Sequence, residues 1–204
     1  MFQIIEQNEN YVICIKPFGI SSEHDMPKLL TEALGGEIFC IHRLDNAVGG
    51  IMVFARNKKT AALLSRQIAE HSFEKNYLAV IEGRPNENSG EMRDLLFKDS
   101  FKNKSYVVKR MRKGVKEAVL SYYLLGEHNG FSLVKISLVT GRTHQIRVQF
   151  GSRKMPLVGD RRYGSKIAAD NICLWSHSLS FKDNNSETVT FTSPPPQNLY
   201  FDKF

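Results

Sequence analysis

Residues 41–55 read Ile-His-Arg-Leu-Asp-Asn-Ala-Val-Gly-Gly-Ile-Met-Val-Phe-Ala, a polar segment followed by an apolar run. The run from Ile51 to Ala55 has the length and the β-branched content of a buried strand. Gly49 and Gly50 precede it and permit a tight backbone turn. Asp45 is therefore predicted to lie on a loop that the core holds rigidly. Asp-Asn is also ordinary turn chemistry, so a plain turn aspartate is the simplest interpretation of Asp45 taken alone.

The chain has 204 residues, of which 42% are hydrophobic, enough for one sizeable core or two small ones. It shows no internal repeat and no low-complexity linker apart from Pro194–Pro196, so we expect a single domain over residues 1–204. The first residues are typical of strands. A basic leader and a long apolar stretch are both missing, so neither a secretory signal nor a membrane span is expected.

The sequence contains no pattern that predicts a metal or a cofactor. Cys14, Cys40 and Cys173 lie far apart, outside any CxxC or Cys/His ligand spacing, so neither a disulfide framework nor a zinc site is supported. A Walker A loop and a dinucleotide fingerprint are also missing. We expect the protein to work without metal or cofactor.

The formal net charge is +7, which suits a polyanionic partner. The basic residues concentrate in a segment that contains one acid, Asp99, and eight basic residues: Lys98, Lys102, Lys104, Lys109, Arg110, Arg112, Lys113 and Lys116. Such a run is often only a solvated face. Its single sign over so long a segment favours contact with phosphates.

The remaining pattern predicts strands and a few helices. Strands are expected at 2–6, 11–15, 77–83, 120–125, 131–138, 174–181 and 189–193, and Asn129-Gly130 is a favoured hairpin turn between two of them. Asn57 can cap a helix that ends before Asn76, with a buried face formed by Ala61, Leu64, Ser65, Ile68 and Ala69. Thr143 can cap a short helix that buries Ile146 and Phe150.

Three ordered motifs resemble those of the RluA-type family of pseudouridine synthases, which isomerise uridine within RNA. They are His-Arg-Leu-Asp at 42–45, the strand that opens at Tyr77, and Gly-Arg-Thr-His-Gln-Ile-Arg at 141–147, which matches almost letter for letter. Lys-Pro-x-Gly at 16–19 and Gly-Asp-x-x-Tyr-Gly at 159–164 resemble further landmarks of that family. The resemblance runs from about Tyr11 to Pro196. Each motif alone is weak, whereas their conjunction in order is specific.

The resemblance implies an α+β fold, with a mixed, largely antiparallel β-sheet, packed helices and a central catalytic cleft. It implies that Asp45 is the catalytic carboxylate, acting as a nucleophile or as a base. Tyr77 is implied to pack against the target base and Arg147 to pair with the carboxylate, since guanidinium suits that geometry. On spacing alone, Tyr77 is an ordinary core residue and Arg147 a surface arginine on a short helix.

The implied partner is ribosomal or transfer RNA, bound by a monomeric cytoplasmic protein with no membrane attachment. Arg43 is implied to fill the gap that a flipped nucleotide leaves in its stack. The other predicted RNA-binding residues come from the motifs and the basic segment: His42, Arg142, Lys109, Arg110, Arg112 and Lys113.

Two departures from the family pattern keep alternatives open. Val48-Gly49-Gly50 stands where the family has Thr-Ser-Gly or a similar sequence, which removes two hydroxyl groups near the site. The catalytic domain is also expected to begin almost at Met1, without the family's frequent S4-type RNA-binding domain. A catalytically inactive RNA-binding relative is one alternative. A hydrolytic glycosidase is another, although it needs a second carboxylate that the matched motifs do not supply.

Overall fold

The computed structural model describes residues 2–197 and 200–204. It divides into two compact units, which are described separately. The first unit comprises Met1–Lys75 and Trp175–Pro194, and the second comprises Asn76–Leu174 and Pro195–Phe204. Both units are built on largely antiparallel sheets with packed helices, so the predicted α+β class is confirmed. That the whole chain acts as one catalytic domain stays a prediction.

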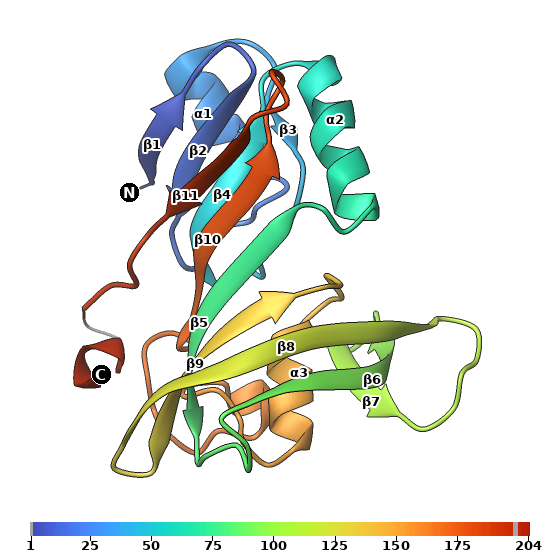
Figure 1. The fold of residues 1–204 in the computed structure, drawn as a ribbon, viewed down its shortest axis with the longest axis vertical. Helices are drawn as coiled ribbons and strands as arrows, with labels where there is room; N and C mark the ends of the chain where they lie inside the picture. The colour runs from blue at the N-terminus through green and yellow to red at the C-terminus, as the bar shows by residue number, and fades with distance from the viewer. Residues whose placement is uncertain (1, 198–199) are drawn as a thin grey trace. The chain divides into compact units, whose positions relative to one another are not determined.

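The sheet of the first unit has the strand order β1 (Gln3–Gln7), β2 (Tyr11–Lys16), β4 (Gly49–Ala55) and β10 (Leu174–Lys182). The short strand β3 (Phe39–Cys40) pairs with β4, and β11 (Thr188–Thr192) pairs with β10. All these pairs are antiparallel except β4 with β10, which run parallel. Figure 1 shows these strands with the two helices of the unit, α1 (Asp25–Leu34) and α2 (Lys58–Ala69).

The core of the first unit is centred on β4, which is buried along all seven of its residues, as the apolar run predicts. Ile51 and Val53 belong to a cluster that also takes residues from β2, α2 and β10, together with Phe73. The rings of Phe73 and Phe181 stack with centroids 5.4 Å apart. Buried aromatic and β-branched residues of this size supply most of the driving force for folding.

Gly49 and Gly50 lie inside β4, where they permit a close approach of β10. A Cβ atom on Gly50 would lie 2.4 Å from the carbonyl oxygen of Ser176, and one on Gly49 would lie 2.6 Å from Cζ3 of Trp175. Gly50 also has a φ of 126°. The turn itself is formed by residues 45–48, just before the glycines. The pattern therefore placed the strand correctly but assigned the glycines to the turn.

Helix α2 begins as predicted but buries a different face. The Asn57 side chain caps it by accepting a hydrogen bond from the Thr60 backbone N–H at 2.8 Å. The buried residues are Thr60, Leu64 and Gln67, whereas Ser65 and Ala69 of the predicted face are exposed. The prediction left out Gln67 because it is polar. Its buried amide is satisfied by two hydrogen bonds of 2.8 Å with the backbone of Lys182.

The sheet of the second unit is antiparallel, with the strand order β5 (Glu74–Glu82), β9 (Phe131–Leu138), β8 (Val115–His128), β6 (Ser89–Asp99) and β7 (Lys104–Val108). The first two residues of β5 belong to the first unit. Asn129 and Gly130 form the two-residue turn between β8 and β9, and both have positive φ, 47° and 79°. This is the predicted Asn-Gly hairpin, in which β9 has the predicted bounds and β8 is longer than expected.

Helix α3 (Gln145–Ser152) buries Ile146 and Phe150, as predicted. Its predicted cap is wrong. The N-cap residue is His144, with a left-handed φ of 54° and no side-chain capping bond. Hydrogen-bond donors of the preceding turn are instead satisfied by the Gln145 side chain. Its Oε1 accepts hydrogen bonds from the Arg142 N–H at 3.0 Å and from the Thr140 hydroxyl at 2.8 Å. Two short 3₁₀ helices, η1 (Arg161–Tyr163) and η2 (Phe201–Lys203), complete the unit.

Helix α1 and strands β3, β6 and β7 were not predicted from the sequence. Helix α1 buries only Met26 and Leu30, too few for a clear 3.6-residue period. Strand β6 fully buries only Met92 and Leu96, four residues apart, and β7 only Ser105, so neither shows a clear apolar alternation. Within residues 2–197 and 200–204, no helix has both the length and the apolar character needed to cross a membrane.

We expect Gly50→Ala to destabilise the fold by at least about 2 kcal/mol, because the new Cβ would clash with Ser176 and the positive φ disfavours any other residue. Gly126→Ala is the matched control. Gly126 has no positive φ, and its Cβ would only approach the movable Phe204 ring at 3.3 Å. Denaturant unfolding of both variants measures the difference. Equal stability of Gly50→Ala and wild type would show that β10 does not pack this closely.

Candidate active site

The loop that carries Asp45 is fixed at several points within the first unit. The Val48 N–H donates to the Asp45 carbonyl at 2.9 Å, which closes the turn. The Ser22 hydroxyl donates to the Leu44 carbonyl at 2.7 Å and accepts from the Leu44 N–H at 2.9 Å. The loop is therefore rigid, as the sequence predicts, and it presents a half-buried carboxylate at Asp45.

Lys16 supplies a buried positive charge to this loop. Its side chain is fully buried, and its Nζ donates to the carbonyls of Pro17 at 2.8 Å, Ile20 at 2.9 Å and Asn46 at 3.5 Å. Burial lowers the pKa of Lys16 to about 8, while the negative charge of Asp45 opposes that shift. The ammonium therefore stays largely charged at neutral pH and interacts with the charge of Asp45.

His42 is a buried, neutral residue of the same loop. Its Nε2 accepts a hydrogen bond from the Val53 N–H at 3.3 Å, and its ring packs against Phe73 with centroids 5.8 Å apart. Burial, with a smaller contribution from the Lys75 charge, lowers the pKa of His42 to about 3. The histidine therefore ties the loop to β4 and the core.

Arg43, next along the loop, points to solvent. Its Nη1 forms an ion pair with Glu23 at 3.0 Å, and both side chains are about half exposed. Such an exposed pair contributes little to stability and is readily exchanged for another anion. Arg43 is therefore accessible to a polyanionic ligand.

In the second unit, Arg147 is anchored by Asp160. Both side chains are buried, and the guanidinium makes two parallel bonds, Nε to Oδ2 at 2.7 Å and Nη2 to Oδ1 at 2.9 Å. The Arg147 guanidinium also lies over the Tyr163 ring, 5.2 Å from its centroid. These contacts fix the orientation of the arginine that the sequence analysis singled out.

Tyr163 also connects this arginine to strand β7. Its hydroxyl accepts a hydrogen bond from the Ser105 N–H at 2.9 Å and lies 2.9 Å from Nδ1 of His144. The Ser105 hydroxyl donates to the Thr143 carbonyl at 2.7 Å. The turn end of the β6–β7 hairpin is therefore bonded to the segment that leads into α3.

The other predicted residues of the second unit lie as follows. Tyr77 is 5% exposed on β5, in register with Ile136 of β9. Arg142 is half-buried, and its Nε donates to the Glu117 carbonyl at 2.8 Å. The predicted basic residues of the loop between β7 and β8 are all exposed: Lys109, Arg110, Arg112 and Lys113.

Two buried charged residues escaped the sequence analysis as site residues, Lys16 and Asp160. Each lies in a landmark that the sequence does show, Lys-Pro-x-Gly and Gly-Asp-x-x-Tyr-Gly. Neither landmark reveals that its charged side chain folds back into the protein to pair with a group some distance along the chain. Among the described residues, no group of three His, Cys, Asp or Glu side chains could hold a metal ion, and the expectation of metal-free catalysis stays a prediction.

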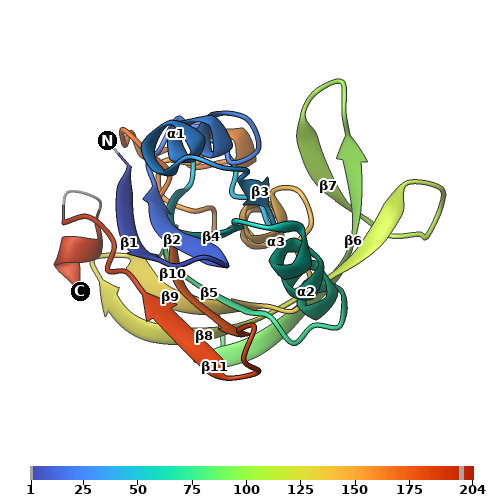
Figure 2. The same ribbon diagram turned by 90° about the horizontal axis from the view of Figure 1, so that it is seen from above.

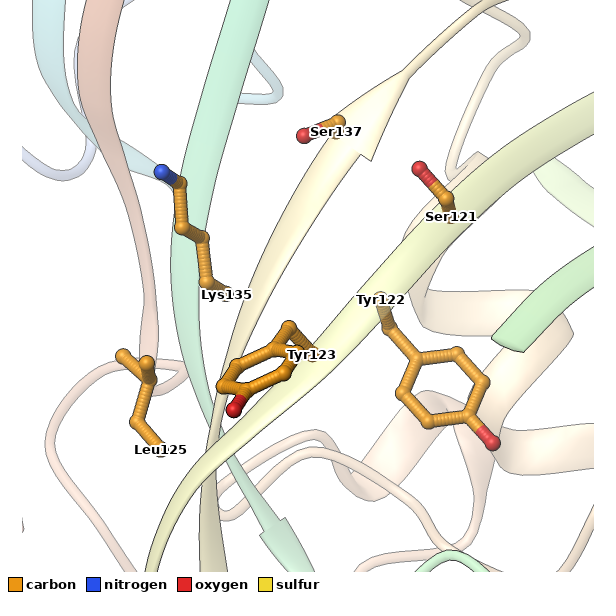
Figure 3. Close-up of a pocket in the computed structure, with 6 residues that line it drawn as sticks. All are labelled: Ser121, Tyr122, Tyr123, Leu125, Lys135 and Ser137. Atoms are coloured by element: carbon orange, nitrogen blue, oxygen red, sulfur yellow. The ribbon is translucent and has the colours of Figure 1, made fainter. Parts of the chain in front are cut away.

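A surface pocket lies on the sheet of the second unit, and two of its lining residues, Lys135 and Ser137, flank the Ile136 that pairs with Tyr77. Figure 3 shows its lining on strands β8 and β9: Ser121, Tyr122, Tyr123, Leu125, Lys135 and Ser137. Tyr123 pairs in register with Lys135, and both are exposed. The pocket contains no carboxylate or anchored arginine, so we assign it no part in the chemistry.

The low pKa of His42 predicts a specific loss of stability in acid. Between pH 6.5 and pH 3 the unfolded chain binds a proton at His42 that the folded protein excludes, so stability falls as the pH falls. The His42 contribution to this loss is on the order of 2 kcal/mol between pH 7 and pH 5. His42→Gln, which can still accept from the Val53 N–H, should lose less stability over that interval than wild type.

The exposed His24 provides the control, because His24→Gln should keep the wild-type pH dependence. Denaturant unfolding at pH 7 and pH 5 measures all three proteins. An identical pH dependence for His42→Gln and wild type would contradict the buried, neutral histidine.

Comparison with known proteins identifies the family. A model of the RNA pseudouridylate synthase family matches residues 10–152, well over half of the chain. The chain is 37% identical to an uncharacterized RNA pseudouridine synthase of Aquifex aeolicus over 131 residues. This match covers 63% of this chain and 40% of that protein. It is 29% identical over 204 residues to the dual-specificity RNA pseudouridine synthase RluA of Pasteurella multocida, covering 94% of this chain and 92% of that one.

The fold agrees with these matches. The structure of human RNA pseudouridylate synthase domain containing 1 superposes with a TM-score of 0.82 at 22% identity, over 96% of this chain and 84% of that one. At this identity the likeness bears on the fold alone. The matched segment contains the loop of Asp45, the strand of Tyr77 and the helix of Arg147. By its sequence and its motifs, the chain belongs to the RNA pseudouridylate synthase family, as an RluA-type member.

Proposed function

We propose that this protein isomerises specific uridines in ribosomal or transfer RNA to pseudouridine, with Asp45 as its catalytic carboxylate. The observation that carries the proposal is the family match over residues 10–152, which spans all three catalytic motifs in order. The rigid Asp45 loop supports it, because bonds from Ser22 and from the buried Lys16 ammonium fix the backbone on both sides of Asp45.

The reaction needs little beyond such a carboxylate. The N1 glycosidic bond of uridine breaks, the freed uracil rotates, and C5 forms the new bond to the sugar, while the C5 proton is lost and N1 gains one. No redox change and no net group transfer occurs, so no cofactor is required. Asp45 acts either as a nucleophile at the sugar or as a base on it. In both roles the carboxylate must be ionised, and its charge interacts with the Lys16 ammonium.

We assign Tyr77 and Arg147 to the same catalytic group, as the family resemblance implies. Tyr77 would pack against the target base, and its place in a regular strand gives the ring a fixed orientation. Arg147 would pair with the catalytic carboxylate. Its bonds to Asp160 support this role, because an arginine fixed by one carboxylate loses little side-chain freedom when it engages a second.

RNA binding would come from exposed basic residues. Arg43 would fill the gap that the flipped nucleotide leaves, giving up its exposed ion pair with Glu23. Arg142 and the loop residues Lys109, Arg110, Arg112 and Lys113 would contact phosphates. His42, being buried, would contribute by fixing the loop on which Arg43 and Asp45 stand. We propose that the chain works as one catalytic domain and as a monomer.

Asp45→Asn should abolish pseudouridine formation while RNA affinity and stability stay close to wild type, since the amide keeps the shape but loses the charge. The matched control is Asp25→Asn. Asp25 lies in the same unit and also interacts with the Lys16 charge, but its carboxylate accepts the Ser21 N–H at 2.8 Å and has no assigned role in catalysis. Pseudouridine is measured in RNA incubated with each protein in excess chelator.

Retained turnover by Asp45→Asn would remove Asp45 from catalysis. A wild-type protein that binds RNA but forms no pseudouridine in ribosomal or transfer RNA would favour the inactive RNA-binding relative instead. Release of free uracil would favour the hydrolytic alternative.

Arg43→Met should slow single-turnover isomerisation more on a folded stem-loop than on an unstructured RNA, because unstacking costs a few kcal/mol only where stacking exists. Glu23→Ala is the control, since it frees Arg43 from its ion pair without removing its charge, and it should not lower the rate on either RNA. Equal impairment of Arg43→Met on both RNAs would rule out the flipping role.

A further inference from the structure

The connection between β6 and β7 exposes a phenylalanine completely. Phe101 is 99% exposed, more than any other large hydrophobic side chain in the described parts of the chain. Exposed apolar residues are common one at a time, but a fully exposed phenylalanine gains nothing from folding. Figure 2 shows the connection as part of the loops that extend beyond β6 and β7.

The turn beneath Phe101 is held by its neighbours. The Lys102 N–H donates to the Asp99 carboxylate at 3.0 Å. The Arg162 Nη1 donates to the carbonyls of Asn103 at 2.7 Å and Lys102 at 3.3 Å. These bonds hold the backbone next to Phe101, which lowers the entropy cost of using its side chain as a contact.

The surroundings of Phe101 are cationic. Lys98, Lys102 and Lys113 are exposed. The pairing of β6 with β8 brings the end of β6 next to the start of β8. There the Arg112 guanidinium lies over the Phe97 ring, 5.1 Å from its centroid. The one acid of the 98–116 segment, Asp99, is engaged with the Lys102 N–H. An aromatic ring amid exposed cations is the combination that binds unpaired nucleotides, with the base stacked on the ring and the phosphates on the cations.

The same hairpin is bonded to the segment that carries Arg147. Ser105, at the start of β7, bonds to the Tyr163 hydroxyl and to the Thr143 carbonyl. Lys104 lies over the Tyr163 ring at 5.3 Å, and Arg147 lies over that ring at 5.2 Å. A nucleotide held at the hairpin tip would thus be held by an element with a fixed relation to Arg147.

We propose that Phe101 stacks on an unpaired base of the RNA substrate and that the lysines around it bind the adjacent phosphates. The identity of the RNA as a substrate rests on the proposed function. The stacking itself is a statement about binding and is tested without turnover.

The test compares Phe101→Ala, Phe101→Trp and wild type in binding to a short oligouridylate that carries one fluorescent purine analogue. Phe101→Ala should bind it about 5- to 100-fold more weakly and should lose the quenching that stacking produces, whereas Phe101→Trp should retain both. A fully paired RNA duplex should bind all three proteins equally. Since Phe101 carries no charge, the slope of affinity against salt should be the same for Phe101→Ala and wild type.

Tyr123→Ala is the matched control, because Tyr123 is 57% exposed on β8 but pairs with Ser89, at the other end of β6 from Phe101. It should bind both RNAs as wild type does. Lys102→Gln should instead flatten the salt slope. Circular dichroism checks that each variant is folded. We expect both Phe101 variants to fold, because the Phe101 side chain is fully exposed.

The stacking proposal is overturned if Phe101→Ala binds the oligouridylate as wild type does, or if it weakens duplex binding equally. It is also overturned if wild type binds neither the oligouridylate nor the duplex, but binds polyglutamate, a polyanion without bases, at this hairpin tip. Failure of the proposed function gives a different result, namely no pseudouridine formed by wild type in any RNA. That assay is run separately on the same preparations.

Discussion

The buried ammonium of Lys16 is the constraint on which the first unit's functional loop depends. Three backbone carbonyls, from Pro17, Ile20 and Asn46, converge on its Nζ within 3.5 Å. This arrangement satisfies a charge that burial would otherwise make very costly. It also connects the turn after β2 to the loop after Asp45. One side chain thereby fixes the backbone next to the carboxylate and supplies a positive charge that interacts with it.

The second unit follows the same physical rule with different residues. The buried Arg147 is satisfied by the bidentate Asp160 and by the face of Tyr163, and Tyr163 in turn is bonded to the turn end of the β6–β7 hairpin. Buried charges of this kind are poor sources of net stability but good sources of fixed orientation. The residues assigned to chemistry are therefore held by the fold, while those assigned to RNA contact, such as Arg43 and Phe101, remain exposed.

The sequence predicted most of the strands because their apolar residues recur as expected for β-structure, and β4 is a clear example. It also predicted the Asn129-Gly130 hairpin, whose positive φ angles require such residues. It did not predict contacts that depend on distant segments. The Gly49–Gly50 pair is explained only by the approach of β10, and the burial of Gln67 only by the Lys182 backbone. Lys16 and Asp160 were passed over for the same reason, because no local pattern shows that a charged side chain is buried.

If Asp45 and Lys16 share one electrostatic environment, the proton equilibrium of Lys16 must depend on Asp45. NMR titration of the lysine side chains measures this directly, with the Lys16 signal assigned by its loss in Lys16→Met. We expect a Lys16 midpoint near pH 8 in wild type and a lower one in Asp45→Asn, because the carboxylate charge raises the Lys16 pKa. A Lys16 midpoint at the ordinary value of 10.5, or one unchanged by Asp45→Asn, would contradict this coupling.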